Sequence, residues 1–152
     1  MSDEISTAAE AAEAAAIPRR HEVHSDPRAR NAADQPLPAG MNKTPAEKKS
    51  PAQWAYERIV LYIKNFEESL DNEHEVAMGF TGADAGILRI EGMGYFDPDI
   101  ITFYGSDPTG AKTQLVQHVS QLNVMLRALP KSVEKDEPTR IGFRLIKDLE
   151  EG

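Results

Sequence analysis

All ten aromatic residues of this 152-residue chain lie after residue 50. Residues 1–50 carry five prolines, and their eight acidic side chains nearly balance seven basic ones. Such a segment cannot bury enough apolar surface to offset the conformational entropy that folding would cost it. The sequence therefore predicts a disordered N-terminal tail, residues 1–49, and a single folded domain, residues 50–152.

The tail holds one local helix signal. Thr7-Ala8-Ala9-Glu10 matches a capping box and opens an Ala-rich stretch to Ala16, which Pro18 ends. An isolated helix of about ten residues is marginal in water. A short helix that folds on a partner and a fraying tail both remain open.

Charge and composition exclude several classes of protein. The formal net charge of −8 disfavours binding to nucleic acids, and the absence of Cys excludes thiolate metal sites and Cys nucleophiles. No apolar run approaches the roughly 20 residues of a membrane span, and the acidic start does not resemble a secretory signal. We expect a cytoplasmic protein that binds no membrane, nucleic acid or nucleotide and carries no cofactor or metal.

The domain begins with a strong helix signal. Ser50 is a cap residue, Pro51 suits the first helical position, and Gln53 completes a capping box. Apolar residues recur at helical spacing from Ala55 to Leu70. We expect the other side of this helix to be solvated surface; it carries Glu57, Arg58, Lys64, Glu67 and Glu68.

Three strands follow in the sequence. Residues 74–80 alternate with period two, residues 87–91 form a second run after a Gly-rich turn, and residues 100–104 are rich in β-branched and aromatic side chains. Gly92 and Gly94 are expected to bend or bulge the second strand. The three runs predict an antiparallel meander.

The rest of the chain predicts a second helix and a last strand. Asp107-Pro108 repeats the cap-plus-proline signal, and apolar residues keep helical spacing from Ala111 to Leu129, before Pro130. Residues 140–145 alternate and predict a fourth strand. The order α-β-β-β-α-β predicts a two-layer α+β domain, with two helices on one face of a mostly antiparallel sheet of three or four strands.

Three groups of residues resemble chemical sites. Gly105 to Thr113 resembles a phosphate-binding loop but misses it by one residue, because Ala111 separates Gly110 from Lys112. His118 is expected on the second helix, half-buried and hydrogen-bonded rather than a catalytic base. Asp97 and Asp99 flank Pro98 as an ordinary turn, and nothing in the sequence brings them together as an acid/base pair.

The predicted α-β-β-β-α order also occurs in double-stranded-RNA-binding domains. Those domains place basic residues at the start of the second helix to contact phosphates. Here only Lys112 precedes Arg127 in that region. The acidic charge therefore disfavours this alternative.

Four sequence blocks resemble an uncharacterised family of small bacterial proteins, a domain of unknown function, over about residues 50–149. The blocks are Trp54-Ala55-Tyr56-Glu57-Arg58, Ala77-Met78-Gly79-Phe80-Thr81-Gly82, Ile90-Glu91-Gly92-Met93-Gly94 and Gln117-His118-Val119-Ser120-Gln121-Leu122-Asn123. The resemblance implies a bacterial, single-domain protein. It implies no catalytic residue.

Strand alternation predicts where a partner would bind. If the apolar residues of the strands point toward the helices, the opposite sheet face carries Arg89, Glu91, Thr102, Tyr104 and Arg144. Tyr and Arg are enriched where proteins dock. We expect a non-enzymatic cytoplasmic interaction or regulatory domain, with a protein partner or self-association on this face. A small-ligand-binding module or minor enzyme is the alternative.

Overall fold

The computed structural model describes residues 22–28, 48–80, 86–134 and 136–151. Its elements are α2 (Pro51–Glu68), β1 (His74–Phe80), β2 (Ile87–Phe96), β3 (Ile100–Ser106), β4 (Lys112–His118), the 3₁₀ turn η4 (Val119–Gln121), β5 (Val124–Pro130) and α3 (Ile141–Glu151). Most of the predicted tail, including the Ala-rich stretch, lies outside the described residues, as does the turn at 81–85.

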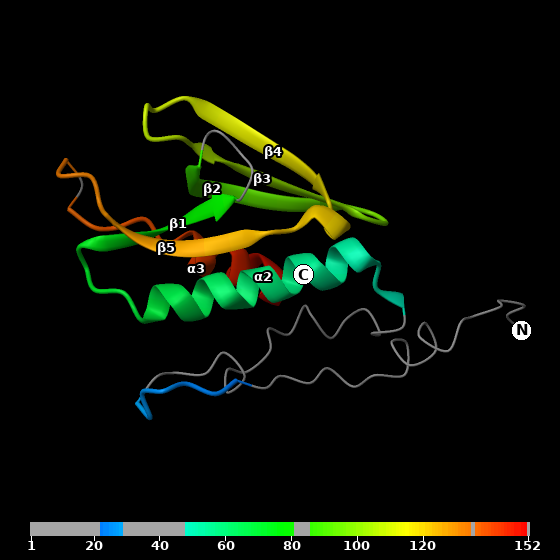
Figure 1. Cartoon of the computed structure of the whole chain (residues 1–152), viewed down its shortest axis with the longest axis horizontal. Helices are drawn as coiled ribbons and strands as arrows, with labels where there is room; N and C mark the ends of the chain where they lie inside the picture. The colour runs from blue at the N-terminus through cyan, green and yellow to red at the C-terminus, as the bar shows by residue number, and fades with distance from the viewer. Residues whose placement is uncertain (1–21, 29–47, 81–85, 135, 152) are drawn as a thin grey trace, which may run out of the picture.

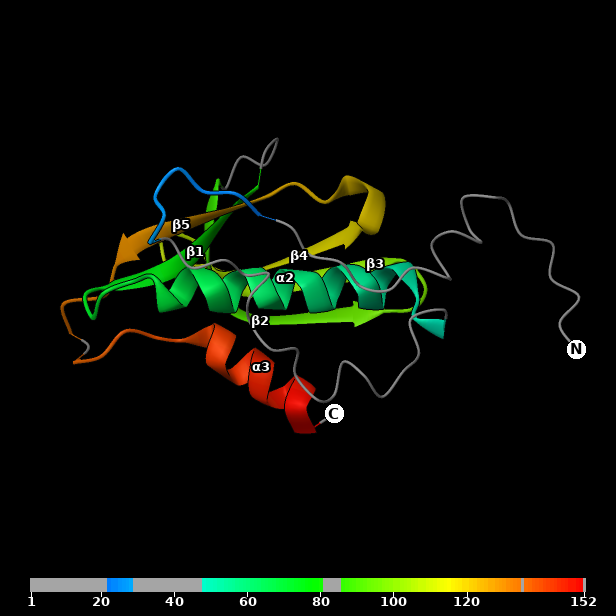
Figure 2. The same ribbon diagram turned by 90° about the horizontal axis from the view of Figure 1, so that it is seen from below.

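The strands form one antiparallel sheet in the order β4-β3-β2-β1-β5. Both helices lie on the same side of the sheet (Figures 1 and 2). The α+β class and the two-layer arrangement are thus confirmed, with five strands instead of three or four. The short turn η4 links the two outer strands, so the sheet curves enough to bring one end of β4 near the start of β5 (Figure 1).

The core lies between the sheet and the helices. Phe103, Ile101 and Met78 are fully buried on the strands and face Val60 and Ile63 of α2. The rings of Phe80 and Phe103 meet edge to face, with 5.1 Å between centroids. The inward positions predicted on β1 and β3 are buried, although β1 is buried at every position from Glu75 to Phe80. A bulge between Ile90 and Gly92 shifts the register of β2, as the glycines of that strand predict.

The predicted second helix is wrong, because residues 112–130 form β4, η4 and β5. The Asp107-Pro108 signal belongs to the β3–β4 turn, in which the Asp107 carboxylate accepts backbone hydrogen bonds from Thr109 and Ala111, each at 2.9 Å. Gly110 there has φ +88°, which favours glycine. On the inner side of β4, Leu115 lies between two polar side chains, so the apolar residues of this strand do not alternate with period two. The sequence therefore does not indicate a strand here.

The predicted fourth strand is also wrong, because residues 141–151 form α3. A longer window shows helical spacing, with Ile141, Leu145, Ile146 and Leu149 all buried in the core. Phe143, which strand alternation placed inside, is 66% exposed. The element order is therefore α-β-β-β-β-β-α.

Ser50 caps α2 as predicted, but Gln53 does not complete the capping box, because its side chain donates to Glu57. The polar side of the helix also differs from the prediction. The Ser50 side chain accepts a hydrogen bond from the Gln53 backbone N–H, at 3.0 Å. Glu57 and Glu67, expected in solvent, are only 2% and 5% exposed. These two carboxylates belong to the interior.

Candidate functional site

The sheet has one face turned away from the helices, which we call the open face. Register and alternation place the following residues on it: Glu75, Ala77, Gly79, Ile87, Arg89, Gly92, Gly94, Thr102, Tyr104, Ser106, Lys112, Gln114, Val116, Met125 and Arg127. Glu91 lies in a β-bulge and has no register partner, and its contacts with Ser106 and Lys112 place it on the same face. Four of the five residues predicted for partner binding, Arg89, Glu91, Thr102 and Tyr104, lie together here.

The fifth predicted residue, Arg144, is not on the open face. It is exposed on α3, which packs on the opposite side of the sheet (Figure 2). Its predicted placement is wrong because the alternation of residues 140–145 predicts a strand, whereas residues 141–151 form a helix.

A row of residues crosses all five strands of the open face. By register its members, from β4 to β5, are Lys112, Ser106, Arg89, Ala77 and Arg127. Three side chains of this row carry positive charge. This side of the acidic protein therefore presents a local line of cations.

Carboxylates on the same face neutralise the first two cations. Lys112 Nζ lies 2.9 Å from Glu91 Oε1, and Ser106 Oγ donates to Glu91 Oε2 at 2.7 Å. Arg89 Nη1 donates to Glu75 Oε1 at 2.9 Å. Lys112 and Arg89 therefore have carboxylate partners.

The Glu75–Arg89 pair is anchored from two sides. Glu75 is 4% exposed and also accepts a hydrogen bond from the Thr139 backbone N–H. Arg89 Nη2 donates to the Pro130 carbonyl at 2.9 Å. Arg89 is therefore held in place rather than offered to a partner.

Arg127 differs from the other two cations. It is exposed on β5, and its side chain forms no hydrogen bond or ion pair with any residue within the described ranges. An Arg guanidinium presents five donors in a rigid fork that matches a carboxylate. Arg127 is available to bind an anion.

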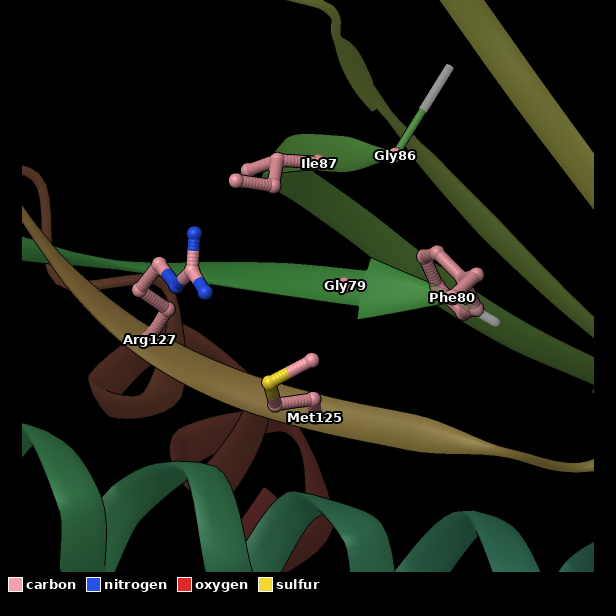
Figure 3. Close-up of a pocket in the computed structure, with 6 residues that line it drawn as sticks. All are labelled: Gly79, Phe80, Gly86, Ile87, Met125 and Arg127. Atoms are coloured by element: carbon pink, nitrogen blue, oxygen red, sulfur yellow. The ribbon is translucent and has the colours of Figure 1, made fainter. Parts of the chain in front are cut away.

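A cavity of about 210 Å³ adjoins Arg127 on the open face. It is lined by Gly79, Phe80, Gly86, Ile87, Met125 and Arg127. Figure 3 shows the side chains of Met125 and Ile87 on either side of Gly79, with the guanidinium of Arg127 at one end. Because Gly79 has no side chain, the cavity extends down to the backbone of β1. The residues that line the cavity are mostly apolar.

His118 ends β4 and pairs with a carboxylate. Its Nε2 lies 2.9 Å from Asp99 Oδ2, and its Nδ1 lies 2.8 Å from Ser120 Oγ. Hydrogen bonds thus connect a Ser, a His and an Asp in the order found in a hydrolase triad. The prediction that His118 lies on a helix is wrong, while its hydrogen bonding is as expected.

The contacts of this trio are those of a turn cap. The Ser120 backbone N–H donates to Nδ1 at 3.1 Å, which assigns the ring proton to Nε2, facing Asp99. The lone pair that would take a proton from Ser120 Oγ is therefore already engaged. His118 also donates its backbone N–H to Gln121 Oε1 at 2.9 Å, which completes the capping box of η4.

The two aspartates of the predicted turn have separate tasks. Asp97 accepts a hydrogen bond from the Ser50 hydroxyl, at the start of α2. Asp99 holds His118, and its carbonyl accepts the Val119 backbone N–H at 2.8 Å. The pair connects neighbouring elements and does not converge on a common point.

Two buried carboxylates were missed by the sequence analysis. Glu57 accepts from Lys49 Nζ at 2.6 Å and from Gln53 Nε2 at 3.1 Å, and this satisfies it inside the fold. Glu67 faces the backbone N–H groups at the start of α3, from Ile141 to Phe143. A carboxylate is favourable there because the N-terminus of a helix is electropositive.

Burial changes the titration of interior groups. Desolvation raises the pKa of Glu67 above its ordinary value of 4.5, against the opposing hydrogen bonds from α3. Burial likewise raises the pKa of Tyr56 to about 12; its ring packs 5.1 Å from that of Tyr95. Both groups belong to the packing between helices and sheet.

Exposed aspartates titrate in the opposite sense. The hydrogen bond with His74 lowers the pKa of Asp71, and that with Thr109 lowers the pKa of Asp107. These shifts come from turn hydrogen bonds that favour the ionised form.

Met125 and Arg127 were not singled out by the sequence analysis because a helix was predicted there. The signal that could have found them is the alternation of β5: Val124 and Leu126 pack on the core, and the residues that follow each of them are exposed.

Comparison with known proteins gives a family and nothing more specific. A family model described as "Family of unknown function (DUF6173)" matches residues 46–144. Neither a curated protein nor a solved structure matches the chain. None of the described helices is both long enough and apolar enough to cross a membrane.

Proposed function

We propose that this chain, which belongs to the DUF6173 family, is a non-enzymatic interaction domain that binds a protein partner on the open face of its sheet. We further propose a bacterial, cytoplasmic setting, on the sequence resemblance and composition given above. The observation that carries the proposal is the set of large exposed side chains on this face: Tyr104 is 43% exposed, Val116 57% and Met125 48%.

These side chains fit the chemistry of protein interfaces. Tyr, Met and Arg are enriched in interfaces, where charged residues such as Lys and Glu are depleted at the centre. The charges next to them, Lys112 with Glu91 and Arg89 with Glu75, are already paired within the chain. A partner that covers the face therefore leaves these charges with their carboxylates.

The alternative of a small-ligand module or minor enzyme has one supporting observation, the cavity at Gly79. Its volume of about 210 Å³ is below the roughly 300–1,000 Å³ of drug-sized ligand pockets. The His118–Asp99 pair lies where β3 begins and β4 ends, near Ile100, whereas the cavity adjoins the start of β2. A cavity of this size favours a single side chain of a partner.

The RNA-binding alternative loses its topological basis. Its α-β-β-β-α order required a helix after the third strand, and Lys112 lies on β4 instead. The net charge of −8 also opposes binding to a polyanion.

The test compares two pairs of exposed residues. The open-face variant combines Tyr104→Ser with Val116→Ser, and the matched control combines Tyr62→Ser with Phe143→Ser on the helices. Tagged full-length proteins are used to capture partners from an extract of the producing organism, and circular dichroism checks folding. We expect the open-face variant to lose a protein that the control retains.

Self-association is measured in parallel by sedimentation velocity. A dimer that dissociates only in the open-face variant identifies a second copy of the chain as the protein partner. If both variants fold and keep the same partners and the same oligomeric state, the proposed function is wrong.

A further inference from the structure

β5 is an outer strand of the sheet. It pairs with β1 along its whole length, from His74 opposite Pro130 to Phe80 opposite Val124. Within the described part of the chain, no other backbone hydrogen bond reaches residues 124–130. The outer backbone N–H and C=O groups of an edge strand are a template for another extended chain.

The side chains of β5 that lie on the open face differ in chemistry. Met125 is apolar and adjoins the cavity above Gly79, and Arg127, two residues later, carries the guanidinium without a partner among the described residues (Figure 3). Residues two apart in a strand lie roughly 7 Å from each other on the same side. A chain paired with β5 presents its own side chains to them at the same spacing.

The cavity has the size and lining for one apolar side chain. Met125 and Ile87 form apolar walls, and Phe80 adds an aromatic one. Contact between a partner's apolar side chain and these walls removes apolar surface from water, which is favourable by about 25 cal/mol per Å². A free ligand small enough for this cavity would gain little binding free energy beyond this apolar contact. A peptide also forms backbone hydrogen bonds with β5.

The positive charge of Arg127 favours an acidic residue as the second side chain of the partner. Lys112 and Arg89 have carboxylate partners on the open face, so Arg127 is the cation of the row that can accept one from outside. The other outer strand, β4, ends in His118, which is engaged by Asp99. These contacts favour β5 over β4 as the edge that binds an acidic group.

We propose that the β5 edge binds an extended peptide of the partner in which an acidic residue and an apolar residue are separated by one residue. The peptide runs antiparallel to β5, as every neighbouring pair in this sheet does. Its acidic side chain pairs with Arg127, and its apolar side chain packs against Met125 and reaches over it toward the cavity, which lies on the β1 side of that residue. This inference rests on the proposed function and specifies the partner's chemistry.

The test uses synthetic peptides and the full-length protein. The probe is acetyl-Thr-Asp-Thr-Leu-Thr-Ser-amide, and its controls replace Asp by Asn, replace Leu by Ala, or place Asp and Leu side by side. Binding is followed by amide chemical shifts in NMR titrations. We expect the shifts to centre on residues 124–130, and each control peptide to bind at least about tenfold more weakly, as expected for a lost charge-assisted hydrogen bond or apolar anchor.

Protein variants locate the site. Arg127→Gln should weaken binding of the probe at least about tenfold and reduce its preference over the Asn peptide. Gly79→Ala adds a methyl group whose nearest neighbour is the flexible Met125 Cε, at 3.3 Å, and should weaken binding of the Leu peptide specifically. Arg144→Gln, an exposed arginine on α3, is the matched control and should leave binding unchanged.

Three results would overturn the inference: no binding of the probe, shifts centred on β4, or equal affinity for the probe and the peptide with adjacent Asp and Leu. If one of these occurs while Tyr104→Ser with Val116→Ser still abolishes partner capture, the inference fails and the proposed function stands. If the open-face variant keeps its partners, the proposed function fails whatever the peptides do.

Discussion

Phe103 and Tyr104 are consecutive residues of β3 that lie on opposite faces of the sheet. Phe103 is fully buried against the helices, and Tyr104 is 43% exposed on the open face. The helix face also contains the two buried carboxylates of α2: Glu57 accepts hydrogen bonds from Lys49 and Gln53, whereas Glu67 Oε2 has no hydrogen-bond partner among the described residues. Most of the buried apolar side chains lie on the helix face, so most of the stability comes from that face.

The largest contrast in stability is expected at these two neighbours. Phe103→Ala should lower the free energy of unfolding by about 3–5 kcal/mol, because it removes a buried ring and leaves a cavity. Tyr104→Ala should cost less than about 1 kcal/mol, because its ring is already partly in water. Urea denaturation of both variants measures the difference, and similar losses at the two positions would contradict the assignment of the faces.

Two glycines sharpen the same comparison. A Cβ at Gly105 would lie 2.1 Å from the Arg89 carbonyl oxygen, whereas a Cβ at Gly92 would meet only the Tyr104 ring, at 3.6 Å. Gly105→Ala should therefore cost about 1–3 kcal/mol through forced displacement of the backbone, and Gly92→Ala should be close to neutral. Thermal unfolding of both variants tests this, and a stable Gly105→Ala protein would show that β2 and β3 are further apart than described.

The helix face should also show a specific pH dependence. Because burial raises the pKa of Glu67 in the folded state, the native protein binds this proton more readily than the unfolded chain. The contribution to stability is fully present below the ordinary pKa of 4.5 and is lost as the pH rises through the raised value. Glu67→Gln should remove this dependence.

The measurement is the difference in unfolding free energy between wild type and Glu67→Gln as a function of pH. Wild type should gain stability relative to the variant as the pH falls from 7. Subtraction removes the opposite contributions of Asp71 and Asp107, whose lowered pKa values make them stabilising above about 3.8. A difference that stays constant with pH would show that Glu67 is not desolvated.

The smallest effect is expected at the β4 edge. Lys112 is 82% exposed in its side chain, and its pair with Glu91 lies in solvent. Lys112→Ala should change stability by less than about 0.5 kcal/mol, and it should leave binding of the Asp-Thr-Leu peptide unchanged. A loss of peptide affinity as large as that of Arg127→Gln would remove the distinction between the two edges.

Sequence patterns predicted one half of the fold better than the other. The capping residues of α2 and the clear alternation of β1 and β3 each reflect strong local chemistry, and the structure follows them. Asp107-Pro108 is a signal shared by helix starts and turns, and only the pairing of β4 with β3 decides between them. The apolar residues in 141–145 fit the period of a strand as well as that of a helix. Contacts with α2 and β2 stabilise the helix.

The candidate site divides in the same way. Arg89, Glu91, Thr102 and Tyr104 could be placed on one face because alternation within single strands defines it. Arg127 and Met125 could not, because their position depends on β5 pairing with β1, whose residues lie 44 or more positions earlier in the chain than their partners on β5. The burial of Glu67 likewise depends on α3, which the local pattern concealed.

Site-specific photocross-linking in the producing organism tests the central claim, that the open face binds a protein, most directly. A photoreactive phenylalanine analogue replaces either Tyr104 on the open face or Tyr62, which is 54% exposed on α2. We predict a discrete cross-linked protein at position 104 that is absent at position 62. A cross-link at position 62 alone, or none at position 104 in a folded and expressed protein, would contradict the account.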